Sequence, residues 1–109
     1  IDFAASQFER VADACREIGR DPNELVRSAA LVICVGRNDD EVAKHAHTIG
    51  REVDELKRNG LAGTPSEVVD RIGTWREQTG ISRLYLQLLD LSDIDQVELI
   101  AAEVAPQLD

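Results

Sequence analysis

The sequence predicts an α/β protein with a parallel sheet, in the order helix, strand, helix, helix, strand, helix. The first indication is the segment Ser28 to Gly36, which is apolar almost throughout, as in strands covered on both faces. The second is a strand-like segment at Arg83–Leu88, separated from the first by segments with helical periodicity. Strands that alternate with helices are typical of parallel sheets.

The first helix is predicted over Asp2 to Ile18, and Gly19 ends it. Asp21 is expected to cap a short helical turn that begins at Pro22 in the "DPNE" sequence. Apolar residues of the first helix recur every three or four positions, which predicts one buried face: Ala4, Phe8, Val11, Cys15 and Ile18.

A second helix is predicted over Asp39 to Arg58, after the first strand. Its first turn is acidic, which suits the positive end of the helix dipole. Its apolar residues follow the same helical spacing and predict a continuous buried face: Val42, Ala46, Ile49, Val53 and Leu56.

The stretch "NGLAGTPSEVVDRIGTW" raises the question of whether its glycines hold a phosphate. Gly60 and Gly63 match neither the P-loop pattern nor G-x-G-x-x-G. Thr64, followed by Pro65 and then Glu67, instead predicts a capping box at the start of a helix. We interpret the segment as a loop that leads into a helix. Anion binding at that helix N-terminus stays open as an alternative.

The last third of the chain predicts a strand and a helix. Gly80 ends the preceding helix, and in "ISRLYLQLL" three leucines alternate with polar or aromatic residues, so one face of the strand is expected to be apolar. Ser92 is expected to cap the final helix, which runs to about Val104 before Pro106. The predicted buried face of that helix is Ile94, Val97, Ile100, Ala101 and Val104.

Two strands leave open sheet edges and cannot cover four apolar helix faces. The sheet is therefore expected to be completed by further chain or by another copy of this chain. The sequence starts at Ile1 and contains no methionine, and we expect residues 1–109 to be a single fragment, the C-terminal part of a larger domain.

The composition excludes several classes of partner. With 12 Lys and Arg against 21 Asp and Glu, the net charge is −9, so nucleic acid and anionic membranes would be repelled. No apolar run approaches the roughly 20 residues that cross a bilayer, and a cytoplasmic protein is expected. Cys15 and Cys34 are expected to be small buried residues rather than a reactive pair.

Two segments carry a family resemblance. The segments "ACREIGRDPNELVRSAALVICVG" and "NGLAGTPSEVVDRIGTWREQTGISRLYLQLLDLSDID" resemble, in this order, the C-terminal third of bacterial luciferase-like monooxygenases. The branch that the chain most resembles uses an 8-hydroxy-5-deazaflavin coenzyme in place of FMN. The resemblance implies a (β/α)8 barrel of the TIM type, with Ala29–Val35 and Arg83–Leu88 as its last two strands.

The resemblance also implies a function. The parent protein would be a flavin- or deazaflavin-dependent oxidoreductase that performs hydride transfer or monooxygenation on a small-molecule substrate. Because most flavin contacts in this family come from upstream strands, the 109-residue chain alone is expected to be inactive and to bind neither coenzyme tightly. The alternative is a small acidic α/β interaction module that self-associates to complete its sheet.

Barrel active sites lie at the C-terminal ends of the strands, where Arg37, Gln87 and Asp90 are the candidate cofactor contacts. A solvated loop residue for Arg37 and a satisfied buried amide for Gln87 remain alternatives. His45 and His47 are two residues apart on a helix, which suits surface residues and not a zinc pair. No metal site, catalytic nucleophile or histidine–carboxylate pair is predicted, and the catalytic residues stay unassigned.

Overall fold

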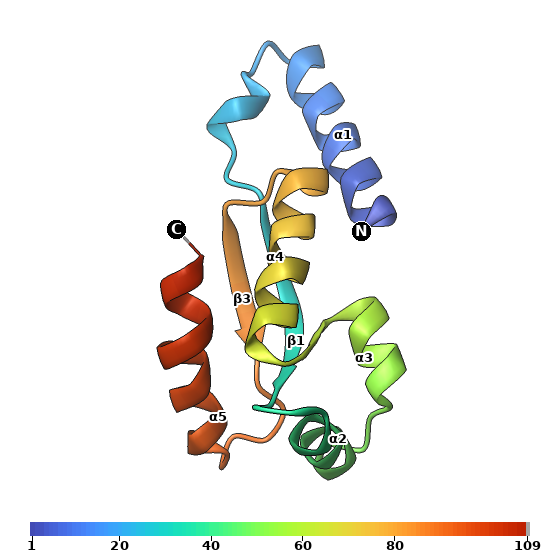
Figure 1. The fold of residues 1–109 in the computed structure, drawn as a ribbon. Coiled ribbons are helices and arrows are strands. Elements are labelled where there is room, and N and C mark those ends of the chain that lie inside the picture. The colour runs from blue at the N-terminus through green and yellow to red at the C-terminus, as the bar shows by residue number, and fades with distance from the viewer. Residues whose placement is uncertain (109) are drawn as a thin grey trace.

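The computed structural model describes residues 1–108 and confirms a mixed α/β architecture with a parallel sheet (Figure 1). Its elements are α1 (Asp2–Glu17), η1 (Pro22–Glu24), β1 (Ser28–Val35), α2 (Asp39–Thr48), α3 (Val53–Asn59), β2 (Leu61–Gly63), α4 (Pro65–Thr79), β3 (Arg83–Gln87), α5 (Ile94–Leu99), η2 (Ile100–Val104) and η3 (Ala105–Gln107). No helix within residues 1–108 combines the length and the apolar composition needed to cross a bilayer.

The sheet has three strands in the order β2-β1-β3, and both pairs are parallel. Strand β1 pairs with β3 over five residues, from Ser28 opposite Arg83 to Val32 opposite Gln87. On its other side, the C-terminal part of β1 pairs with β2, from Ile33 opposite Leu61 to Val35 opposite Gly63. The two strands that the sequence predicts are therefore direct neighbours.

The third strand, β2, corrects the predicted number of strands. It occupies Leu61–Gly63, in the segment interpreted from the sequence as a loop, and all three residues are buried. A Cβ atom on Gly60 would lie 2.6 Å from the Val32 carbonyl oxygen, so only glycine permits this approach to β1. Gly63 has φ 137°, a conformation that favours glycine. Gly60 and Gly63 thus serve the pairing of β2 with β1.

The predicted helix over 39–58 is divided into α2 and α3. The break follows Ile49 at Gly50, which has φ 69° and ends α2 in the left-handed conformation. The element order consequently contains one more helix than predicted. The apolar face was nevertheless predicted correctly, because all five of its residues belong to one cluster: Val42, Ala46 and Leu56, buried, with Ile49 and Val53 packed against them.

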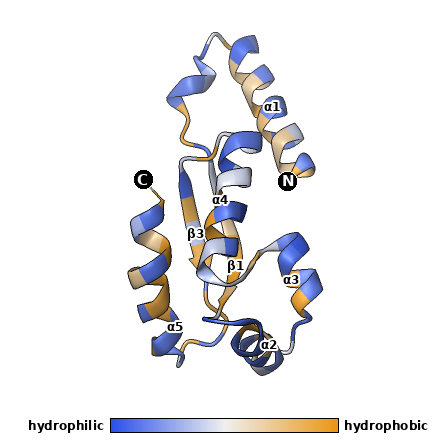
Figure 2. Ribbon diagram, in the orientation of Figure 1, coloured by the Kyte–Doolittle hydropathy of each residue, from blue (hydrophilic) through white to orange (hydrophobic). Residues whose placement is uncertain are grey.

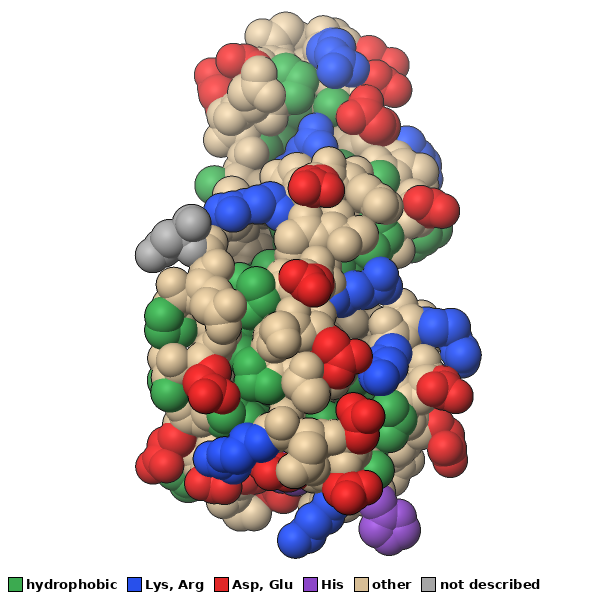
Figure 3. Space-filling model, in the orientation of Figure 1, with side chains coloured by type: hydrophobic (Ala, Val, Ile, Leu, Met, Phe, Trp, Pro, Cys, Tyr) green, Lys and Arg blue, Asp and Glu red, His purple; other side chains and the backbone are tan. Residues whose placement is uncertain are grey.

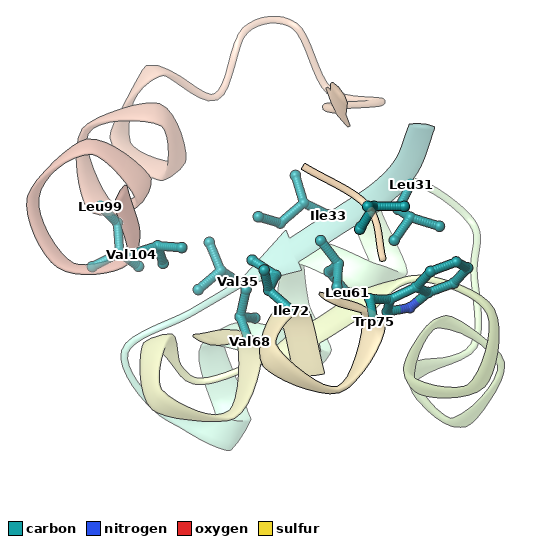
Figure 4. Close-up of a cluster of buried hydrophobic side chains, with 10 residues drawn as sticks. Leu31, Ile33, Val35, Leu61, Val68, Ile72, Trp75, Leu99 and Val104 are labelled. Atoms are coloured by element: carbon teal, nitrogen blue, oxygen red, sulfur yellow. The ribbon is translucent and has the colours of Figure 1, made fainter. Parts of the chain in front are cut away.

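One face of the sheet is covered by α4 and the C-terminal helical segment, and α1 packs against α4. The core on this face contains Leu31, Ile33 and Val35 of β1, and it joins them to α4 and to the end of the chain (Figure 4). Burying each large aliphatic side chain contributes about 1.5–3 kcal/mol. The other buried members are Leu61, Val68, Ile72, Trp75, Ile81, Leu99 and Val104.

The opposite face is covered only at its β2 side. Cys34 and Ala62 pack there against α2 and α3, whereas Ala30 and Gln87 are exposed and Tyr85 is 54% exposed. The expectation that β1 is covered on both faces therefore holds only for its C-terminal half. The radius of gyration, 15.6 Å, exceeds the value of about 13 Å for a compact domain of this length.

Two predicted helix faces are partly wrong. On α1, Ala12 and Cys15 are buried, while Val11 and Ile18 are exposed. On the last helix Ile94 and Val97 are exposed, and the buried residues are Gln96, Leu99 and Val104. Orange segments in Figure 2 mark the hydrophobic residues along α1 and α5. These faces carry more apolar side chains than the three-stranded sheet covers.

Candidate functional site

The C-terminal ends of β1 and β3 lie at the same edge of the sheet, because the strands are parallel. The loop after β1 leads through Arg37 into α2, and the loop after β3 leads through Asp90 and Asp93 into α5. These two loops and the helices that follow them bring polar side chains together at this edge. Figure 1 shows α2 and the start of α5 near this end of the sheet.

A histidine–carboxylate pair joins α2 to the loop that leads into α5. His45 Nδ1 lies 3.0 Å from the Val35 carbonyl oxygen, and His45 Nε2 lies 3.4 Å from Asp93 Oδ2. Only 18% of the His45 side chain and 14% of the Asp93 side chain are exposed. This corrects the prediction that His45 is a surface residue, and the pair is one that the sequence did not reveal. His47, in contrast, is exposed as predicted.

Gln96 of α5 completes a hydrogen-bonded network with His45 and Asp93. Its Oε1 accepts a 2.9 Å hydrogen bond from the Val35 amide, and its Nε2 donates to Asp93 Oδ2 at 3.1 Å. Asp93 Oδ1 accepts from the Gln96 amide at 3.0 Å and so caps α5, in place of the predicted cap Ser92. The last residue of β1 is thereby bonded to α2 through its carbonyl and to α5 through its amide.

The partners of His45 define what the network can do. Both ring nitrogens of His45 are already engaged, Nδ1 with the Val35 carbonyl oxygen and Nε2 with the Asp93 carboxylate. Neither ring nitrogen is then left to take a proton from a substrate. The geometry thus favours a role in holding the two loops in place over a role as a general base.

Arg37 lies in the loop directly after β1 and is exposed. Its Nη1 is 3.0 Å from Glu41 Oε1 and 3.4 Å from Asp95 Oδ2, and these carboxylates, Glu41 first, raise the pKa of Arg37. Asp95 precedes Gln96 in α5. Arg37 therefore forms a second, exposed link between the two loops, and an incoming anion would compete with these carboxylates for its guanidinium.

Asp90 is held within its own loop. Its Oδ1 accepts hydrogen bonds from the Ser92 hydroxyl at 2.6 Å and from the Ser92 amide at 3.1 Å. These bonds, that of the hydroxyl first, lower the pKa of Asp90, and the charge of His45 lowers it further. Gln87, the last residue of β3, is exposed on the sheet face opposite the larger core, so it is not the satisfied buried amide of the alternative interpretation.

The start of α4 has the predicted capping box. Glu67 Oε1 accepts from the Thr64 amide at 3.1 Å and from the Thr64 hydroxyl at 3.0 Å, which lowers the pKa of Glu67. The chain's own carboxylate thus occupies the helix start where an anion was an alternative.

Within residues 1–108, no group of three or more His, Cys, Asp or Glu side chains is placed to hold a metal ion. Both cysteines are free and buried, as predicted. Burial, and secondly the charge of Asp93, raises the pKa of the Cys34 thiol, which therefore stays protonated and unreactive near neutral pH.

Comparison with protein-family models and with curated proteins finds no match. Among solved structures, the chain is similar to an F420-dependent secondary alcohol dehydrogenase in complex with an F420-acetone adduct, with a TM-score of 0.70 and 16% sequence identity. The match covers 89% of this chain but only 36% of that enzyme. At this identity the similarity concerns the fold, and the chain spans just over a third of the length of the enzyme.

The sequence analysis did not predict the three residues of this network, and the sequence signals for them differ in strength. Asp93 and Gln96 are spaced as a cap and the third helical residue, so "DIDQ" carried a capping signal that competed with Ser92 and Asp95. His45 lies three residues after the buried Val42 and next to the buried Ala46, which places it at the border of the apolar face. Its carboxylate partner is 48 residues away, and spacing does not reveal such a pair.

Proposed function

We propose that this chain forms the C-terminal part of a (β/α)8-barrel oxidoreductase of the luciferase-like family, which uses an 8-hydroxy-5-deazaflavin coenzyme for hydride transfer. The observation that supports it most is the direct parallel pairing of β1 with β3 in a fold similar to part of an F420-dependent enzyme. F420 is itself a coenzyme of the deazaflavin class, and FMN is the alternative coenzyme. The complete protein would act on a small molecule in the cytoplasm.

In this proposal the chain contributes to the rim of the active site and the parent supplies the catalytic groups. The ends of β1 and β3 face the cofactor side of the barrel, where Arg37, Gln87 and Asp90 are the proposed contacts to coenzyme or substrate. The network of His45, Asp93 and Gln96 fixes the loops that carry Arg37 and Asp90. The coenzyme supplies the hydride chemistry, and these residues orient it and limit its access to water.

The exposed sheet face supports the same proposal. The side chains of Ala30, Tyr85 and Gln87 would point into the barrel, where layers of side chains from the strands fill the interior. The outer edge of β3 would pair with the first barrel strand. Further strands would therefore both cover the exposed sheet face and pair with the open edge of β3.

A titration tests the proposal. The protein encoded by the reading frame that continues upstream of Ile1 is titrated with the deazaflavin coenzyme and with FMN, and binding is followed by coenzyme fluorescence. We expect saturable deazaflavin binding by the longer protein and none by the 109-residue chain. A frame that starts at Ile1, or tight binding of either coenzyme by the short chain, contradicts the proposal.

The second candidate function is a small interaction module that completes its sheet by self-association. The observation that favours it is the open edge of β3 next to half-exposed or exposed apolar residues such as Tyr85, Leu89 and Leu91. The same reading frame separates the two functions. A start codon beside Ile1, with a stable dimer or larger oligomer of the 109-residue chain, would favour the module.

A further inference from the structure

A groove lies on the helix-covered side of the molecule, between α4, the start of β3 and the C-terminal turn. Its volume is about 320 Å³, at the lower end of the range of about 300–1,000 Å³ for small-molecule sites. Figure 3 shows the surface hollowed beside α4, with a cationic side chain along its upper border. The lining residues are Val69, Ile72, Gly73, Arg76, Ile81, Ser82, Arg83, Leu84, Gln107 and Leu108.

The lining combines an apolar floor with positive charge. Half of these ten residues are aliphatic, two are the arginines Arg76 and Arg83, and none of the described lining residues is acidic. Arg76 Nη1 lies 3.5 Å from the Leu108 carbonyl oxygen, so its guanidinium reaches toward the C-terminal wall. In a chain with net charge −9, two cations without an acidic residue in the same lining favour an anionic ligand with an apolar body.

Gly73 keeps the groove open. It lies in the interior of α4, where glycine is less favourable than any residue except proline. A Cβ atom at this position would meet no heavy atom within 4 Å, and Gly73 does not have a positive φ, so neither packing nor backbone conformation requires glycine. Its missing side chain leaves space in the wall formed by α4.

We propose that this groove binds a small amphiphilic anion, a carboxylate or similar acid on a compact aliphatic body. The aliphatic part lies on Ile72, Ile81 and Leu84, and the acid group lies between the guanidinium groups of Arg76 and Arg83. The site goes beyond the proposed oxidoreductase function. It lies at the start of β3, while the His45 network lies at the opposite, C-terminal ends of the strands.

The test is an isothermal titration of the protein with octanoate, and with 1-octanol as the uncharged analogue. We expect one saturable octanoate site and at least about tenfold weaker binding of 1-octanol, because the charge-assisted contacts are lost. Arg76→Gln and Arg83→Gln should each weaken octanoate binding by about tenfold. Arg10→Gln removes the same charge at an exposed position of α1 that does not line the groove, and it should leave octanoate binding unchanged.

Gly73→Leu tests the location. Leucine fills the open space at this position and favours the helix, so the melting temperature should not fall while octanoate binding is lost. The proposal is overturned if octanoate does not bind saturably or if 1-octanol binds equally well. It is also overturned if a folded Gly73→Leu variant binds octanoate as tightly as the unsubstituted protein does. None of these outcomes depends on deazaflavin binding.

Discussion

The two faces of the sheet differ in how far this chain covers them. On one face, Leu31, Ile33 and Val35 are buried under helices that the chain itself provides. On the other, Ala30 and Tyr85 are neighbours across β1 and β3, and both are exposed. The same strands thus have one completed side and one open side, and a parallel sheet normally has both sides covered. The helices of this chain thus cover one face of its sheet, and the face that carries Ala30 and Tyr85 is the one that the proposed barrel would enclose.

A charge on the open face of the sheet should have the greatest effect on stability. Ala30→Lys should change the free energy of unfolding of the 109-residue chain by less than about 0.5 kcal/mol, because Ala30 is exposed there. In the complete barrel the lysine would be buried without a partner, at a cost of about 3–5 kcal/mol. Urea unfolding of both proteins measures the difference. Ala43→Lys, on the exposed side of α2, is the matched control, and equal small losses at both positions would argue against a covered inner face.

A smaller effect is expected on the completed face. Leu61 in β2 is fully buried, so Leu61→Ala should lower the free energy of unfolding of the chain by about 2–5 kcal/mol. Leu89→Ala, at a position that is 49% exposed, should change it by less than about 0.5 kcal/mol. Chemical denaturation compares the pair. A negligible change in the free energy of unfolding for Leu61→Ala would contradict the burial of Leu61 in the third strand.

The two histidines of α2 should differ in how much they contribute to stability. His45→Ala removes contacts with Val35 and Asp93, and bonds to charged groups contribute about 1.5–3 kcal/mol each, so a loss in this range is expected. His47→Ala, two residues along the same helix, removes an exposed side chain and should have almost no effect. Thermal unfolding of the two variants should separate them. Similar melting temperatures would mean that His45 does not hold the loops.

The smallest effect concerns the start of α4. Thr64→Ala should lower the free energy of unfolding by about 1 kcal/mol through the lost cap, whereas Ser66→Ala, at an exposed position, should change it very little.

The same cap makes stability depend on pH. Hydrogen bonds from Thr64 lower the pKa of Glu67 below its ordinary value of 4.5, so the unfolded chain binds the proton more tightly. This contribution is present above pH 4.5 and is lost as the pH falls through the folded-state pKa. Unfolding measured against pH should show the loss, and Glu67→Gln should abolish it.

Periodicity predicted which residues are buried better than it predicted where elements end. The apolar face from Val42 to Leu56 was correct although Gly50 divides the helix, because both parts pack on the same side of β1 and β2. The capping box at Thr64 was also predicted, since it is a local interaction. Strand β2 was missed because three residues carry no periodic signal and become a strand only by pairing with β1.

The candidate site was less predictable than the fold. The strand ends that carry Arg37 and Asp90 followed from the strand assignment, whereas the contact of His45 with Asp93 depends on how the two loops meet in space. The apolar residues at Ile18 and Ile94 were assigned to buried faces by spacing alone. Helical periodicity identifies the apolar face of a helix. Whether that face is buried depends on how much sheet lies next to the helix.

Static light scattering of the 109-residue chain in dilute solution tests most directly whether its inner face and open edge require a partner. We predict a mass clearly above the 12.0 kDa of one chain, because copies associate along the open edge of β3. A single species of 12.0 kDa that also unfolds cooperatively would contradict the account.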